Sequence, residues 1–307
     1  MELSNKCFDK VKKDYLKFLN KEKIFNKSNA SKIKNLKNFY IPMSIWIDNK
    51  YKKKGKTLFL GLSGSQGSGK TTISGILKII LKKFFKRKIH VISIDDFYKE
   101  LKVRKKMSYN IHPLFETRGV PGTHDINIVK KFFHFIKKKN FKRYILPKFD
   151  KSIDDRVEKK YWSTVETKPE IVILEGWCVG AKPQKNSLIK KPKNILEKYE
   201  DKTLIWRKHI NKKLKKEYKY LFNMIDHFIF MKIPDFNVVY KWRLLQETKL
   251  KKKSYSNKKI MSYKEIKRFI MFYERITLQM LKDLSKSASI VMTLKKNQEI
   301  KKILFKS

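Results

Sequence analysis

Residues 64–71 constrain the fold of this chain more than any other part of the sequence. They read GSQGSGKT and fit the pattern G-x-x-x-x-G-K-[ST] at every fixed position. In such a loop the glycines let successive backbone N–H groups turn toward phosphates, the lysine adds a mobile positive charge, and the last hydroxyl can bind Mg²⁺. We therefore expect a nucleoside triphosphate to be bound by these residues: Gly64, Ser65, Gln66, Gly67, Ser68, Gly69, Lys70, Thr71 and Thr72.

The flanks of this loop predict the strand and helix that the motif requires. Residues 57–63 (TLFLGLS) form a short apolar run typical of a buried parallel strand, and residues 72–85 have the apolar spacing of a helix. Further short apolar runs occur at 90–94, 170–174, 227–231 and 289–294, separated by helical or polar stretches. The sequence thus predicts an α/β chain with a P-loop NTPase fold, in which helices cover both faces of a mostly parallel sheet.

The chain is long enough, at 307 residues, for one large domain or two smaller ones, and one is the simpler interpretation. Residues 1 to about 50 have apolar positions at helical spacing, which we expect Pro42 to interrupt. We assign residues 1–56 to an N-terminal helical extension that packs on a nucleotide-binding domain of residues 57–307. Two Lys-rich segments, 182–193 and 249–259, are predicted to be mobile loops.

The formal charge of +48 and a pI near 10.1 would ordinarily indicate a polyanionic partner. However, only nine of the 76 basic residues are Arg, and the lysines are scattered along the whole chain, so we expect no specific nucleic-acid partner. Cys7 and Cys178 indicate no disulfide framework, and no segment has the character of a secretion signal or a membrane span. We expect a cytoplasmic protein, and the oligomeric state stays open.

Acidic residues follow two of the predicted strands. Asp95 and Asp96 come after the run at 90–94, at the carboxyl end where ligands bind in open α/β sheets. Asp95 could accept a proton from an attacking hydroxyl or hold Mg²⁺, whereas Asp96 could simply cap a turn. Glu175 ends the run at 170–174 and is expected to lie beside the metal, together with Thr71.

Two polar segments between these strands are candidates for an acceptor site. Residues 147–156 (PKFDKSIDDR) mix acids and bases, so that Asp150 could accept from hydroxyls while Lys151 or Arg156 pairs with a carboxylate. A solvated charged loop is the alternative. Arg118 and His124 lie in a Gly- and Pro-rich segment and are further acceptor candidates, although a histidine next to an aspartate is often only a hydrogen-bonded pair.

Arg243 lies late in the chain, in a predicted helix at the position where many small-molecule kinases have a lid. It could swing over the transferring phosphoryl group and act as a catalytic cation. Alternatively, it could form a surface ion pair with Glu247, four residues further on. The sequence does not decide between these two roles.

Taken together, the segments GSQGSGKTT, SIDDFY, TRGVPGTHD, PKFDKSIDDR, LEGWCVG and WRLLQE resemble the D-glycerate 3-kinase family, over roughly residues 40–294. The resemblance implies a kinase-type P-loop fold and transfer of phosphate from ATP to D-glycerate, with Mg²⁺. It implies that Asp95 is the base, with Lys70 and Arg243 also catalytic, and that the metal contacts are Thr71, Glu175 and Asp95. Substrate roles are implied for Asp96, Tyr98, Arg118, His124, Asp150, Lys151 and Arg156.

Two other functions are compatible with these motifs. Uridine kinases share the pattern at Asp95–Tyr98, as D-S-F-Y, and the P-x-[FY]-D block. A related kinase for uridine, pantothenate or another small alcohol is therefore one alternative. A nucleotide-switched binding protein is the other. The acid at Asp95 and the segment FDKSIDDR favour an enzyme with an acceptor hydroxyl over a switch.

Overall fold

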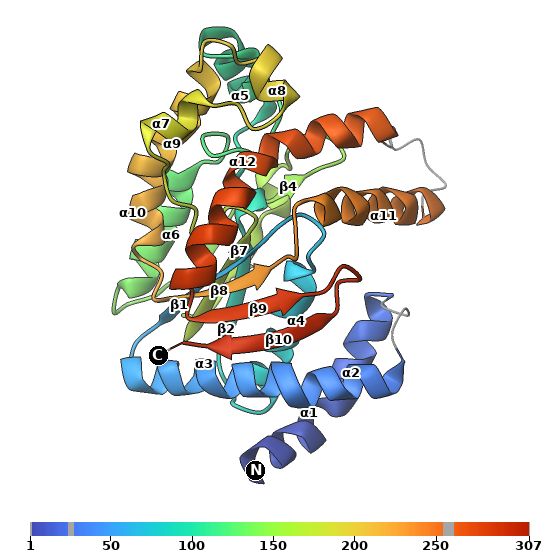
Figure 1. Ribbon diagram of the computed structural model, residues 1–307. Coiled ribbons are helices and arrows are strands. Elements are labelled where there is room, and N and C mark those ends of the chain that lie inside the picture. The colour runs from blue at the N-terminus through green and yellow to red at the C-terminus, as the bar shows by residue number, and fades with distance from the viewer. Residues whose placement is uncertain (1, 24–27, 254–260, 307) are drawn as a thin grey trace.

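A six-stranded sheet forms the centre of the molecule (Figure 1). The computed structural model describes residues 2–23, 28–253 and 261–306. The strand order is β10 (Ile300–Phe305), β9 (Ile290–Leu294), β8 (His227–Lys232), β1 (Leu58–Gly64), β7 (Ile171–Gly176) and β2 (Ile89–Ser93). All neighbours pair in parallel except β10, which is antiparallel to β9. The prediction of a mostly parallel sheet built on five apolar runs is confirmed.

Alternating side chains of the strands fill two separate cores. In β1, Phe59 points into one core, whereas Leu58, Leu60 and Leu62 point into the other. The first core is covered by α6 (Ile126–Lys137) and α12 (Tyr263–Ser287), and the second by α4 (Lys70–Lys83) together with the N-terminal helices (Figure 1). Helices therefore cover both faces of the sheet, as predicted.

The N-terminal region is helical: α1 (Glu2–Lys21), α2 (Asn29–Asn35), a π-helical turn at Leu36–Tyr40, and α3 (Ile41–Lys54). The expectation that Pro42 interrupts the helix is wrong, because Pro42 lies in the first turn of α3, where no N–H is needed. Val11 and Tyr15 of α1 are buried in the same core as Leu58, Leu60 and Leu62 of β1. The division at residue 56 stays a prediction.

The remaining elements are short helices, one longer helix and two small strand pairs that connect the strands of the sheet. They are α5 (Leu101–Asn110), α7 (Asn186–Lys190), α8 (Ile195–Tyr199), α9 (Ile205–Lys213), α10 (Lys219–Phe222), α11 (Asn237–Lys253) and the two strand pairs β3 (Tyr144–Leu146) with β6 (Ser163–Val165) and β4 (Phe149–Asp150) with β5 (Asp155–Arg156). Short 3₁₀ turns lie at Ile94–Phe97, Pro113–Phe115 and Lys159–Tyr161, and a second π-helical turn lies at Leu214–Tyr218.

The two Lys-rich segments differ from the predicted loops. Within 182–193, residues 186–190 form α7, and buried Arg275 of α12 donates to the carbonyls of Leu188 and Lys191 at 2.9 and 2.6 Å. These two hydrogen bonds, which we call the Arg275 clamp, join residues far apart in the sequence and could not be predicted from residues 182–193 alone. Within 249–259, residues 249–253 continue α11, and 254–259 lie outside the described residues.

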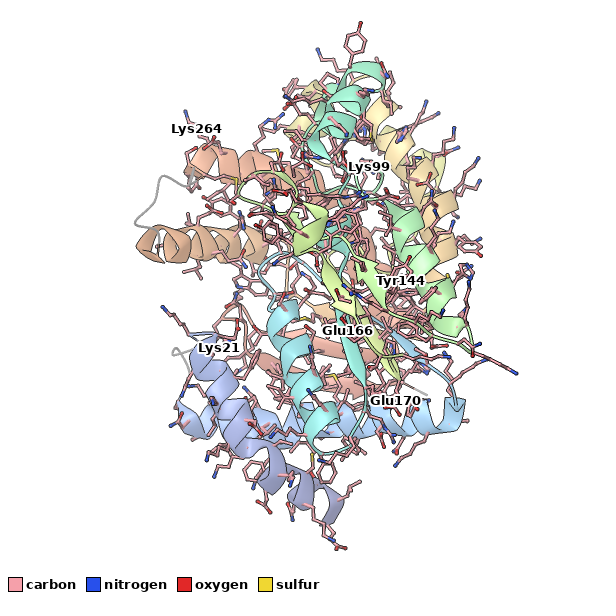
Figure 2. All side chains as sticks on the ribbon, turned by 180° about the vertical axis from the view of Figure 1, so that it is seen from behind. Lys21, Lys99, Tyr144, Glu166, Glu170 and Lys264 are labelled. Atoms are coloured by element: carbon pink, nitrogen blue, oxygen red, sulfur yellow. The ribbon has the colours of Figure 1, made fainter. Side chains whose placement is uncertain are left out.

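The two ends of the parallel strands lie far apart in the molecule. Figure 2 shows Glu170, which precedes β7, beside α3 at one end, and Lys99, which follows the turn after β2, at the other. Tyr51 of α3 donates to Glu170 at 2.7 Å and so fixes the amino end. Within the described ranges, no helix combines the length and the apolar character that crossing a bilayer would require.

Candidate active site

The phosphate-binding loop connects β1 to α4, as the motif requires. Gly67 has φ +73°, and a Cβ there would lie 2.8 Å from Cβ of Trp242 in α11, so only glycine fits. Gln298 donates to the Gly67 carbonyl at 2.7 Å from the turn between β9 and β10. The loop is therefore braced from outside by two elements that come much later in the sequence.

Lys70 is the first residue of α4, and its ammonium donates to the carbonyls of Gly64 and Ser65, both at 3.0 Å. Burial lowers the pKa of Lys70, and this effect is opposed by the carboxylates of Glu175 and Asp95. The amino end of α4, with its free N–H groups and positive dipole, opens at the same place. The loop thus presents a ready anion site.

Glu175 and Thr71 form a pair of oxygen ligands beside this loop. The Thr71 hydroxyl donates to Glu175 Oε1 at 2.9 Å, while Glu175 Oε2 is buried and has no hydrogen-bond partner within the described chain. Burial raises the pKa of Glu175, although Lys70 and Thr71 oppose the shift. Mg²⁺ prefers a few protein oxygens and completes its shell with phosphates and water, so this orphaned carboxylate oxygen fits Mg²⁺.

A cavity of about 310 Å³ joins the loop to the carboxyl ends of β2 and β7. Among the described residues, four cations and two carboxylates line it: Lys70, Arg118, Lys151 and Arg243, with Asp95 and Glu175. The other predicted residues in its lining are Gln66, Gly67, Gly69, Thr71, Thr72 and Tyr98. Because cations outnumber carboxylates, the cavity suits anionic ligands.

Asp95 lies in this cavity with two partners. Its Oδ2 lies 2.7 Å from the Lys151 ammonium, and its Oδ1 accepts from the Tyr98 hydroxyl at 2.9 Å. Burial alone would raise the pKa of Asp95, but Lys151 and Tyr98 outweigh it and lower the pKa to about 2. Asp95 is therefore a carboxylate at neutral pH and can accept a proton or bind a cation.

Arg156 and His124 do not line the cavity, and both hold Tyr98 instead. Arg156 Nε donates to the Tyr98 carbonyl at 2.8 Å. His124 is buried, stacks on the Tyr98 ring at a centroid distance of 4.5 Å, and lies 2.7 Å through Nδ1 from the Tyr218 hydroxyl. Burial lowers the pKa of His124 to about 4, so it is neutral. The structure places both residues one layer behind the cavity wall.

Asp150 and Asp96 also lie outside the cavity lining. Asp150 Oδ1 accepts from the backbone N–H and the hydroxyl of Ser152, at 2.8 and 2.6 Å, and so shapes the turn after β4. Asp96 accepts from the Phe149 N–H at 3.4 Å, and burial raises its pKa to about 6. Asp125 is the N-cap residue of α6 but makes no side-chain capping bond, and its Oδ2 lies 3.6 Å from Arg156 Nη2.

Of the two roles expected for Arg243, the ion pair is present, and the catalytic role stays a prediction. Arg243 forms an ion pair with Glu247 on the same helix, donates to Gln246 at 3.2 Å, and lines the cavity at the same time. Its Nε is buried and has no partner within the described residues, so part of the guanidinium is left for a ligand. Movement of α11 as a lid stays a prediction.

Six residues of the cavity lining were not predicted as site residues: Ser93, Gly176, Trp177, Gln246, Phe269 and Tyr273. Phe269 and Tyr273 lie one turn apart on α12, and their rings contact each other at 4.9 Å. Their helical i, i+4 spacing was a visible signal, but it is equally typical of an ordinary core face. Gln246 lies three residues after Arg243 and shares its helix face.

The chain is similar to known kinases. No family model matches the chain. The uncharacterized kinase mug58 of Schizosaccharomyces pombe is 30% identical over 238 residues, which are 74% of this chain and 82% of that protein. The chloroplastic D-glycerate 3-kinase of Arabidopsis thaliana is 30% identical over 257 residues, 78% of this chain. The chain belongs to the D-glycerate 3-kinase family.

The aligned part spans about half, 53%, of the Arabidopsis D-glycerate 3-kinase. A solved D-glycerate 3-kinase of Cryptococcus neoformans superposes with a TM-score of 0.74 at 23% identity, covering 87% of this chain and 98% of that one. This likeness confirms the P-loop kinase fold. The predicted enzyme class, a phosphotransferase acting on an alcohol group, is also confirmed, and ATP use follows from it.

Proposed function

We propose that this kinase phosphorylates the 3-hydroxyl of D-glycerate with ATP and Mg²⁺, giving 3-phosphoglycerate and ADP. One observation carries the proposal: Asp95 lines the same cavity as Lys70, Arg118 and Lys151, and its Oδ2 lies 2.7 Å from the Lys151 ammonium. A carboxylate that can take a hydroxyl proton thus shares one cavity with the phosphate-binding lysine and two further cations. An acceptor that bears both a hydroxyl and a carboxylate matches this arrangement.

In the proposed reaction the acceptor hydroxyl oxygen forms a bond to the γ-phosphorus, and the bond from that phosphorus to the bridging oxygen of ADP breaks. Asp95 accepts the hydroxyl proton, while the loop N–H groups and Lys70 hold the phosphates in line. Arg243 stabilises negative charge on the moving phosphoryl group. Thr71 and Glu175, and Asp95 directly or through water, would hold Mg²⁺, which neutralises phosphate charge when bound.

Arg118 and Lys151 are the proposed contacts of the acceptor carboxylate, because both line the cavity near Asp95. For Arg156 and His124 we propose an indirect role, since they hold Tyr98, whose hydroxyl orients Asp95. Asp96 and Asp150 support the same wall through their bonds to Phe149 and Ser152. The proposed acceptor site thus has one layer of residues that line the cavity and a second layer that supports them from behind.

We also propose a reducing location such as the cytoplasm, which is supported by two buried free cysteines. The small acceptor makes a specific nucleic-acid partner unnecessary. Fractionation of cells that produce the tagged protein tests the location. Competition between a specific RNA and a scrambled RNA at several salt concentrations tests whether the protein has a specific nucleic-acid partner. Binding that arises from charge alone does not depend on the RNA sequence.

ADP release by the purified protein tests the proposed function. The acceptors compared are D-glycerate, L-glycerate, glycerol, uridine and pantothenate, each with ATP and Mg²⁺, and Lys70→Ala serves as a control without nucleotide use. The proposal predicts stimulation by D-glycerate alone. Stimulation by uridine or pantothenate instead would move the function to a related kinase, and no stimulation at all would favour a nucleotide switch.

A further inference from the structure

Asp154 lies in the turn between β4 and β5, outside the cavity, in a backbone conformation that is unusual for a residue with a side chain. Its φ is +55°, in the left-handed region. Aspartate and asparagine tolerate this region better than most residues, at a modest energetic cost. The turn that carries Asp154 also carries Lys151, so the conformation of this turn decides where a cavity cation lies.

The carboxylate of Asp154 bridges two arginines that come from different segments. Oδ1 pairs with Arg118 Nη1, and Oδ2 lies 3.0 Å from Arg104 Nη2. The centroid of the Phe149 ring lies near both guanidinium groups, at 5.6 Å from Arg118 Cζ and 5.9 Å from Arg104 Cζ. Asp154 is therefore the anionic centre of a cluster with one buried and one cavity-facing cation.

Arg104 is the fixed member of this cluster. It belongs to α5, its side chain has 0% exposure, and it donates to the carbonyls of Lys99 and Glu116 at 3.2 and 2.6 Å. A buried arginine with these partners has no freedom to move without losing several hydrogen bonds. Since Arg104 also donates to the Asp154 carbonyl, it anchors both the backbone and the carboxylate of that residue.

Arg118 is the member that faces the cavity. Its backbone is held by two hydrogen bonds: the Arg118 carbonyl accepts from the Tyr273 hydroxyl at 3.4 Å, and the N–H of Gly119, the next residue, donates to the Thr123 hydroxyl at 3.1 Å. Its side chain is held by Asp154 and donates to the Lys151 carbonyl at 3.4 Å. With both ends constrained, the guanidinium presents one orientation to the cavity, and this orientation depends on Asp154.

We propose that Asp154 is a positioning residue that sets the affinity for the acceptor carboxylate by orienting Arg118 against the buried Arg104. The inference rests on the proposed function, in which Arg118 binds that carboxylate. Asp154 does not touch the substrate. Its removal frees Arg118 to take other rotamers, so that a planar, two-pronged contact with a carboxylate is lost while the nucleotide half of the cavity is unchanged.

Steady-state kinetics of Asp154→Asn test this role. Asparagine keeps the tolerance for a left-handed backbone and removes only the charge, so the fold should persist and can be checked by thermal melting. We expect KM for D-glycerate to rise about tenfold or more, with KM for ATP unchanged and kcat within about threefold. Glu158→Gln is the matched control, because Glu158 lies four residues after Asp154, is exposed, and pairs with exposed Lys160 at 2.8 Å.

A double-mutant cycle with Arg118→Met separates positioning from general structure. If Asp154 acts through Arg118, Asp154→Asn should add no further increase in KM once Arg118 is Met. Additive effects, an unchanged KM in Asp154→Asn, or an equal rise in KM for ATP would each overturn the inference. Failure of the unmodified protein to phosphorylate D-glycerate would instead overturn the proposed function, so the two failures are distinguishable.

Discussion

The ammonium of Lys151 lies 2.7 Å from Oδ2 of Asp95, which joins the turn after β4 to the carboxyl end of β2. Lys151 is largely exposed and free to move, whereas Asp95 is held on its other oxygen by Tyr98. The contact keeps the proposed base ionised and at the same time places a cation next to the position of the reacting hydroxyl. A substrate carboxylate that attracts Lys151 would release one oxygen of Asp95 for the incoming hydroxyl.

The pH profile of a Lys151→Met variant tests this pairing. The pKa of Asp95 is lowered to about 2 against its burial, with Lys151 the largest opposing cause, so removal of the cation should raise that pKa. We expect the acidic limb of kcat/KM for D-glycerate to move to higher pH in the variant. Lys148→Met, which removes an exposed charge from the same segment, should leave the limb in place. If the acidic limb of kcat/KM lies at the same pH in the unmodified protein, in Lys151→Met and in Lys148→Met, the result would contradict the pairing of Lys151 with Asp95.

Asp96→Asn should stabilise the protein at neutral pH. Burial raises the pKa of Asp96 to about 6, so its contribution to stability is fully present below the unfolded pKa and is lost as the pH rises through 6. The amide oxygen of asparagine can keep the bond from the Phe149 N–H. Urea unfolding should give a gain of about 1–2 kcal/mol at pH 7.5 and almost none at pH 4. A lower free energy of unfolding for Asp96→Asn at pH 7.5 would contradict this prediction and show that the charge of Asp96 stabilises the fold.

Arg275→Met should destabilise the fold and loosen residues 182–193. Arg275 is buried and pairs with Glu197, which is 1% exposed in its side chain, at 2.6 Å. Loss of the cation leaves a buried carboxylate with less compensation, at a cost of about 3–5 kcal/mol. Hydrogen exchange of residues 188–193 should accelerate together with the fall in urea midpoint.

A matched control exists on the same helix. Arg268 pairs with Glu200 at 2.5 Å, with 49% and 43% of their side chains exposed, so Arg268→Met should cost less than about 1 kcal/mol. Equal losses of unfolding free energy in Arg275→Met and Arg268→Met would refute the role of the Arg275 clamp. Unchanged hydrogen exchange of residues 188–193 in Arg275→Met would also refute it.

The sheet and the phosphate loop could be predicted because their signals are local. Short, mostly apolar runs of five to seven residues predict β1, β2, β7, β8 and β9, and the loop motif is contiguous. Glu175 and Asp95 followed from the same reasoning, since strand ends in a parallel sheet meet at one edge. These predictions needed no knowledge of tertiary contacts.

The acceptor side could be predicted only as a set of segments. Lys151 and Arg156 lie in one segment of charged residues, yet one faces the cavity and the other reaches behind Tyr98. That difference depends on the left-handed turn at Asp154 and on Arg104, neither of which has a local signal. Tyr273 enters the site from α12, more than 90 residues beyond Glu175 in the sequence, and apolar spacing alone cannot show which helix face borders a cavity.

The formation of 3-phosphoglycerate by the unmodified protein and by Asp95→Asn, measured side by side at saturating ATP and Mg²⁺ with the product identified by NMR, tests the central claim most directly. The account predicts that the unmodified protein forms this product from D-glycerate and that Asp95→Asn reduces turnover by about 10² to 10⁴ while ATP binding persists. No product from the unmodified protein, or full turnover in Asp95→Asn, would contradict it.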